Sequence, residues 1–163
     1  MSCVTNSIEE IAMSTTNKDV SEVVLEQHKD VAARLAAVLN KTGSDRTEEF
    51  ESLAEFLAVH EAAEESVIYP ALRKLGDEGT RIADDRTREE GAASDVLTKL
   101  KGFDTGSDKF ETTFTEFATK VHEHAASEEA EVLPLLTSTT TTEQRQAMGN
   151  VFLESQHGVS SHR

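Results

Sequence analysis

The chain has 163 residues, 37% of them hydrophobic and 5% aromatic, without tryptophan, a size and composition typical of one soluble helical domain. Its formal net charge of −15 argues against binding to nucleic-acid phosphates or anionic membrane surfaces, and no apolar run is long enough to span a bilayer. The single cysteine, Cys3, excludes an intrachain disulfide. Together with the lack of a basic-then-apolar leader, it predicts a cytoplasmic protein.

The first half of the chain predicts two helices after a disordered tail over residues 1–18. The first helix runs from about Val20 to Leu39, because apolar residues and His28 recur at spacings of three and four. Polar residues 40–44 end it, and Asp45 with the glutamate three positions later predicts a capping box for the second helix. That helix ends near Pro70, and the glycines at 76 and 79 form the next break.

The second half predicts three more helices. The third spans roughly residues 81–101, residues 102–108 form a loop, and the fourth begins near Phe110. A shorter fifth helix covers about residues 143–156, and residues 158–163 are expected to be disordered. No segment alternates with period two, so the chain is predicted to be all-α. Short connections predict an up-down-up-down four-helix bundle with a short additional C-terminal helix, forming one domain over residues 19–157.

An internal repeat places the same chemistry on the second and fourth helices. His60 and Glu64 recur as His124 and Glu128, each 64 positions further along the chain. Residues four positions apart share one face of a helix, so each pair can converge on a single point. The repeat therefore predicts two matching His-x-x-x-Glu elements at one height in the bundle.

These polar residues continue the apolar stripes of their helices, as do His28 in the first helix and Glu90 in the third. Buried, unpaired carboxylates each cost several kcal/mol, in a domain whose total stability is only about 5–15 kcal/mol. A metal compensates such groups, because cations bind neutral imidazole and ionised carboxylate. The predicted metal ligands are His28, His60, Glu64, Glu90, His124 and Glu128.

The mixture of donors narrows the choice of metal. The lack of thiolates disfavours structural zinc, and three histidines disfavour calcium or magnesium. Two irons, or manganese, bridged by carboxylates fit best. The remaining histidines, together with the glutamates that follow Glu64 and Glu128, are expected to lie in solvent.

The stretch 60–70, which reads His-x-x-x-Glu-Glu and ends in Tyr-Pro, and its copy 124–134, which ends in Leu-Pro, resemble the hemerythrin-like HHE domain family. The resemblance covers roughly residues 20–136. It implies two irons joined by an oxo or hydroxo bridge. It further implies bridging carboxylates and terminal histidines, assigned here to Glu64, Glu128, His28, His60 and His124.

The third helix departs from the family pattern, because Glu90 stands where a histidine is expected. An anionic oxygen donor stabilises ferric iron and favours peroxide or oxygen chemistry over reversible oxygen carriage. With this ligand set, about two coordination positions would remain open to an incoming ligand. Tyr69, just before Pro70, has two interpretations: a packing residue near the bundle end, or a phenol that hydrogen-bonds or ligates the irons.

The sequence therefore favours a di-iron enzyme that decomposes hydrogen peroxide in a catalase-like way. The family resemblance supports this expectation, because some hemerythrin-like proteins are similar in having this activity. The alternative is a protein that senses or binds oxygen, nitric oxide or iron without turnover. A purely structural bundle is disfavoured, because its buried carboxylates would stay unsatisfied. The sequence identifies no protein partner.

Overall fold

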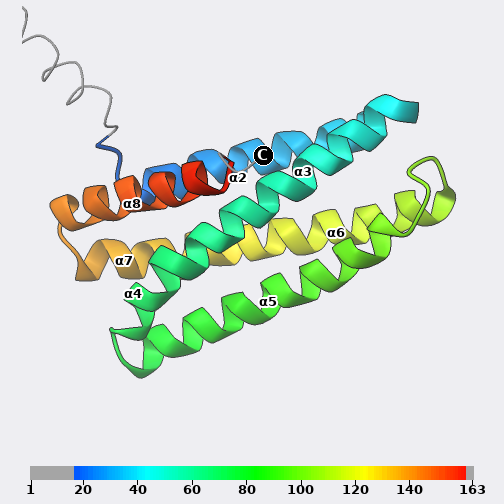
Figure 1. Ribbon diagram of the computed structural model, residues 1–163. Coiled ribbons are helices and arrows are strands. Elements are labelled where there is room, and N and C mark those ends of the chain that lie inside the picture. Colours follow the sequence, from blue (N-terminus) through cyan, green and yellow to red (C-terminus); the bar gives the residue numbers. More distant parts are fainter. Residues whose placement is uncertain (1–16, 161–163) are drawn as a thin grey trace, which may run out of the picture.

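The computed structural model describes residues 17–160, and these residues form helices joined by short turns, with no strand among them (Figure 1). Residues 1–16 of the predicted N-terminal tail and residues 161–163 of the predicted C-terminal tail lie outside this part. The helical elements are α2 (Val20–Asn40), α3 (Gly43–Ala63), η1 (Glu64–Ile68), α4 (Tyr69–Arg73), α5 (Asp77–Lys101), α6 (Asp108–Ser127), η2 (Glu128–Val132), α7 (Leu133–Thr139) and α8 (Thr142–Ser160).

The long helices pack lengthwise into a bundle. Figure 1 shows α2 beside α3 and α5 beside α6, and both pairs are in contact. α4 continues α3 through η1, and α7 continues α6 through η2. The last helix, α8, turns back at one end of the bundle and packs against α2 and α3. The prediction of an all-helical bundle with an additional C-terminal helix is confirmed in this form.

The π-helical turns η1 and η2 occupy matching positions in the two copies of the repeat. Each lies just before a Tyr-Pro or Leu-Pro step, because Pro70 and Pro134 lack an amide hydrogen and their rings would crowd the carbonyl four residues back. The helix instead forms a wider, π-helical turn. The residue before each proline donates its N–H to the carbonyl five residues back, which is that of Glu64 in one copy and Glu128 in the other. Both π turns therefore begin at the repeated glutamates.

The buried apolar residues form two clusters along the bundle axis. One contains Phe50, Phe110, Phe114 and Phe117, and the other contains residues from both ends of the chain, including Phe152. Along α2, α3 and α5, and along α6 with its continuation through η2, the predicted metal ligands separate residues of one cluster from residues of the other. The polar site is thus a layer between two apolar cores, which keep the backbone around it rigid.

Three local predictions need correction. α3 begins at Gly43, which has a φ of 60°, so Asp45 lies inside the first turn instead of capping the helix. Gly79 is not part of a break, because α5 already begins at Asp77. A Cβ at this position would lie 1.9 Å from the carbonyl oxygen of Leu72, so a side chain would prevent α4 and α5 from packing this closely. α8 extends to Ser160, beyond the expected end near residue 156.

Candidate metal centre

The fold brings the six predicted metal ligands together in two overlapping groups. The first contains His28, His60, Glu64 and Glu128, and in it the ligand atoms, one from each residue, all lie within 4.8 Å of one another. The second meets the same limit with Glu90 and His124 in place of the two histidines. Glu64 and Glu128 therefore belong to both groups.

The repeated His-x-x-x-Glu elements converge as their spacing predicts. His60 Nε2 lies 3.1 Å from Glu64 Oε1, and His124 Nε2 lies 2.5 Å from Glu128 Oε1. Each histidine lies in the last turn of an α-helix and each glutamate begins the following π turn, so both pairs lie at the same place in their helices. The two elements therefore present equivalent nitrogen and oxygen atoms from opposite copies of the repeat.

Most of the donor atoms are buried and without hydrogen-bond partners, which is the condition a bound cation would relieve. Glu64 and Glu128 are completely buried, and none of their four carboxylate oxygens has a hydrogen-bond partner. Both ring nitrogens of His28, Nε2 of His124 and Oε2 of Glu90 are also buried and unpartnered. Such a set costs too much free energy to be retained for packing alone. Imidazole nitrogen and carboxylate oxygen are donors that suit iron, so these residues fit the metal their types predict.

Gln27 and Glu89, which the sequence did not indicate as part of the site, contact Nδ1 of two of the histidine rings. Nδ1 of His60 lies 2.8 Å from Oε1 of Gln27, and the Gln27 amide also exchanges hydrogen bonds with Gln156 of α8. Nδ1 of His124 lies 2.8 Å from Oε2 of Glu89. Such contacts fix ring orientation and leave Nε2 turned toward the centre.

Several charged residues surround this layer. Arg86 is 6% exposed and lies 2.9 Å from Glu89, while Glu129 lies 3.6 Å from Nδ1 of His28. Glu129 was expected to serve only solubility, so its place beside His28 adds a neighbour that the sequence did not indicate. Glu65 is exposed, as expected.

Tyr69 lies beside the site as a hydrogen-bond donor. Its hydroxyl donates to Oε1 of Glu90 over 2.6 Å, and the side chain is buried. Burial and the nearby carboxylates of Glu64 and Glu128 raise the pKa of this phenol far above its usual range, so it holds its proton. Of the two interpretations of Tyr69, the hydrogen-bonding one matches this geometry, and the donation fixes the Glu90 carboxylate.

Without metal, the site retains protons unevenly. Burial raises the pKa of Glu64 well above its usual value and that of Glu61 to about 8, whereas burial lowers the pKa of His60 to about 4. Burial also opposes the charged forms of His124 and Glu128, but neighbouring side chains outweigh it. The carboxylates of Glu128, Glu90 and Glu89 raise the pKa of His124 to about 11. Contacts with Glu64 and His124 lower the pKa of Glu128 to about 2. A cation that binds here must displace some of these protons.

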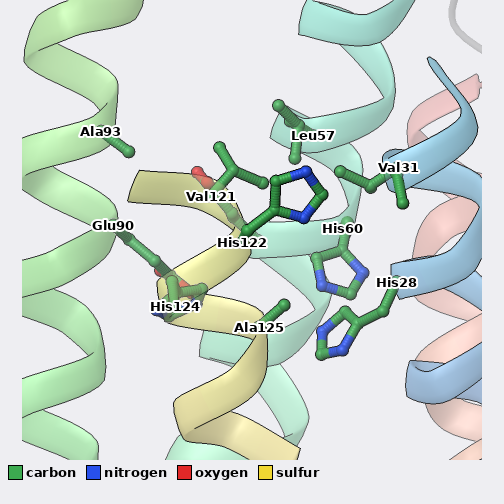
Figure 2. A pocket seen from close by; sticks show the side chains of 12 residues that line it. His28, Val31, Leu57, His60, Glu90, Ala93, Val121, His122, His124 and Ala125 are labelled. Atoms are coloured by element: carbon green, nitrogen blue, oxygen red, sulfur yellow. The ribbon is translucent and has the colours of Figure 1, made fainter. Parts of the chain in front are cut away.

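A small cavity adjoins the donor atoms (Figure 2). Its volume is about 30 Å³, and apolar side chains from the long helices, including Val31, Leu57 and Val121, form one side of it. His28, His60, Glu90 and His124 form the opposite side, so the cavity opens onto both donor groups. A space of this size admits a ligand of a few atoms.

Two of the histidines expected to lie in solvent are described. His122 and His157 are exposed, as expected, although His122 also lines the cavity. His162 lies outside the described residues. In the described residues, no helix is long and apolar enough to serve as a membrane span.

A helical bundle that buries paired histidines and carboxylates in one layer defines a class of cation-binding proteins. The family model described as "Hemerythrin HHE cation binding domain" matches residues 19–136, so the chain belongs to the hemerythrin HHE cation-binding domain family and the resemblance seen in its sequence is confirmed. A crystal structure of a hemerythrin HHE cation binding domain-containing protein from Mycobacterium kansasii has a TM-score of 0.80 and 20% sequence identity to this chain, covering 89% of each chain. That likeness shows a shared fold. No curated protein matches the sequence.

Proposed function

We propose that this domain, over residues 19–157 and with α2, α3, α5 and α6 in up-down-up-down order, holds two iron ions joined by an oxo or hydroxo bridge. Glu64 and Glu128 would be shared by both irons, His28 and His60 would complete one set of ligands, and Glu90 and His124 would complete the other. The observation that carries this proposal is the sharing of the two glutamates by both donor groups. A lone cysteine, Cys3, fits a cytoplasmic location.

We further propose that the centre decomposes hydrogen peroxide in a catalase-like way. When bound, the iron pair supplies the redox chemistry and the open positions at which a small ligand binds. One peroxide molecule gives up two electrons and two protons to become dioxygen, and a second takes them up to become two waters. The cavity supports this proposal, because it borders the donors of both positions and its volume of about 30 Å³ suits a molecule as small as peroxide. Glu61, which burial keeps protonated at neutral pH by raising its pKa to about 8, also lines it.

The alternative function is sensing or binding of dioxygen, nitric oxide or iron without turnover. The apolar side of the cavity favours it, because Val31, Leu57, Ala93 and Val121 offer no hydrogen bonds to a bound ligand and suit a diatomic gas. A reversible spectral change on cycling either gas, without consumption of peroxide, would select this alternative.

Metal content tests the site, and oxygen evolution tests the activity. We expect about two irons per chain, and we expect His60→Ala and Glu128→Ala each to lose most of the bound iron because each removes a donor from the shared layer. The matched controls are His157→Ala, on exposed α8 surface, and Glu123→Gln, an exposed residue of α6 outside both donor groups. Full iron retention in both site variants would remove the proposed centre. Oxygen evolution from peroxide no faster than that of free iron would remove the catalase-like activity.

A further inference from the structure

The two donor groups differ in charge outside the glutamates they share. His28 and His60 complete one group, and Glu90 and His124 complete the other (Figure 2). Oε1 of Glu90 lies 3.4 Å from Nε2 of His124, and its Oε2 has no hydrogen-bond partner. Once a cation has displaced the protons of the site, one half of the layer adds two imidazole nitrogens, whereas the other adds one imidazole nitrogen and one carboxylate oxygen.

The residues that contact Nδ1 of the two repeated histidines also differ in charge, and again the negative charge is on the Glu90–His124 side. His60 Nδ1 meets the neutral amide oxygen of Gln27, and His124 Nδ1 meets the carboxylate of Glu89, both at 2.8 Å. A carboxylate increases the basicity of the imidazole it contacts, and thus its donation to a cation, more than a neutral amide does. The pair Gln27 and Glu89 therefore adds to the difference that Glu90 creates.

Three neighbours modify this difference without removing it. Arg86 lies 2.9 Å from Glu89 and offsets part of its charge, but it acts through Glu89 and His124, whereas Glu90 would contact the cation itself. The Tyr69 hydroxyl donates a hydrogen bond to Oε1 of Glu90 and leaves Oε2 without a partner. The Glu129 side chain, beside His28, is 43% exposed, so solvent screens its charge.

We propose that the two halves select different cations: the Glu90–His124 half holds trivalent iron, and the His28–His60 half accepts a divalent ion such as zinc. The inference rests on the proposed dinuclear site. It follows from donor chemistry, since a hard trivalent ion prefers anionic oxygen and imidazole suits zinc. The chain can then assemble a mixed iron–zinc pair with each metal in a fixed position.

The test places the two metals by diffraction. Metal-free protein receives one equivalent of ferric citrate and then one equivalent of zinc, and crystals of the product are measured at the iron and zinc absorption edges. We expect iron to be enriched about tenfold or more in the Glu90–His124 half, with zinc in the other half. Equal scrambling of both metals would overturn this inference while leaving the dinuclear site intact. Failure of these residues to hold two metals would instead contradict the proposed function.

Two variants separate the sources of selectivity. Glu90→His removes the anionic donor, and we expect the iron preference to fall toward an equal distribution. Gln27→Glu gives His60 the carboxylate neighbour that His124 already has, and we expect a smaller change in the same direction. Because Gln27→Glu is nearly isosteric and does not alter a donor, it keeps the test open if Glu90→His fails to fold. Glu123→Gln serves as the charge control and should leave the distribution unchanged. An unchanged distribution in both site variants would overturn the inference.

Discussion

Replacing Glu64 with methionine should stabilise the metal-free protein while abolishing its response to metal. The Glu64 side chain is completely buried, and both carboxylate oxygens lack hydrogen-bond partners. Burial raises its pKa well above the usual value, so folding forces this side chain to keep a proton that the unfolded chain releases at neutral pH. Methionine has a similar length and no group that requires hydration.

The expected gain in the free energy of unfolding is the difference between favourable and unfavourable contributions. Leaving a buried polar group without a partner costs about 1–3 kcal/mol, and the variant relieves that cost. The variant also loses the 3.1 Å contact between Glu64 and His60, a contribution of about 1 kcal/mol, although His60 keeps its hydrogen bond to Gln27. Replacing buried ionic groups by apolar residues of similar volume has stabilised other proteins by about 1–4 kcal/mol. We expect the lower part of that range here, about 1–2 kcal/mol.

Urea unfolding followed by circular dichroism measures both halves of this prediction. Without metal, Glu64→Met should unfold at higher urea than the unaltered protein. With iron the order should reverse, because a metal that binds only the folded state adds about 4 kcal/mol at a thousandfold excess over its Kd. Glu123→Met, at an exposed position of α6, controls for the added methionine. A metal-free Glu64→Met protein that is less stable than the unaltered one would refute the reasoning that the buried carboxylate is a cost of metal binding.

Three further predictions concern the frame around the site. Phe114→Ala should lower the free energy of unfolding by about 3–5 kcal/mol in urea titrations, because the side chain is completely buried in the aromatic cluster. Gly79→Ala should cost about 1–3 kcal/mol and lower Tm, because the new Cβ would lie 1.9 Å from a backbone carbonyl oxygen. The metal-free protein should lose stability between pH 6.5 and 8. Glu61, whose pKa rises from 4.5 to about 8, and His124, whose pKa rises from 6.5 to about 11, keep protons in the folded state that the unfolded chain releases. Constant stability over that interval, measured by urea titration at each pH, would contradict these shifts.

The sequence was sufficient to predict the helices and the six residues that the fold brings together. Its strength lay in periodicity: His28, His60 and Glu90 each fall on an apolar stripe, so burial of the stripe also buries them. The repeat then fixed the common height of the second and fourth helices. Helix starts were predicted less well, because Gly43 and Gly76 allow each helix to begin earlier than the polar pattern indicated.

The contacts outside the donor layer could not be predicted from the same patterns. Gln27 and Glu89 each sit next to a predicted ligand in the sequence, on the polar margin of a helix, where most such residues face water. Their partners, His60 and His124, lie 33 and 35 positions away, so the contacts depend on the rotation of one helix against another. A single sequence predicts which face of a helix is buried. It does not predict the rotation of the helix closely enough to say which side chain of the next helix a residue at the margin will contact.

The repeat supplies four of the six candidate metal ligands, and helices outside the repeat supply the other two. The duplicated helices α3 and α6 each supply one histidine and one shared glutamate, and each is followed by a π turn that begins at that glutamate. The helices α2 and α5 are not copies of each other at this level, and they supply His28 to one half and Glu90 to the other. Symmetry between the halves therefore comes from the repeat, and any chemical difference between the two metal positions must come from α2, α5 and the side chains beside them. For this reason Glu90 and Gln27, which lie outside the repeat, are the positions at which substitution should alter metal selectivity without dismantling the shared carboxylate bridge.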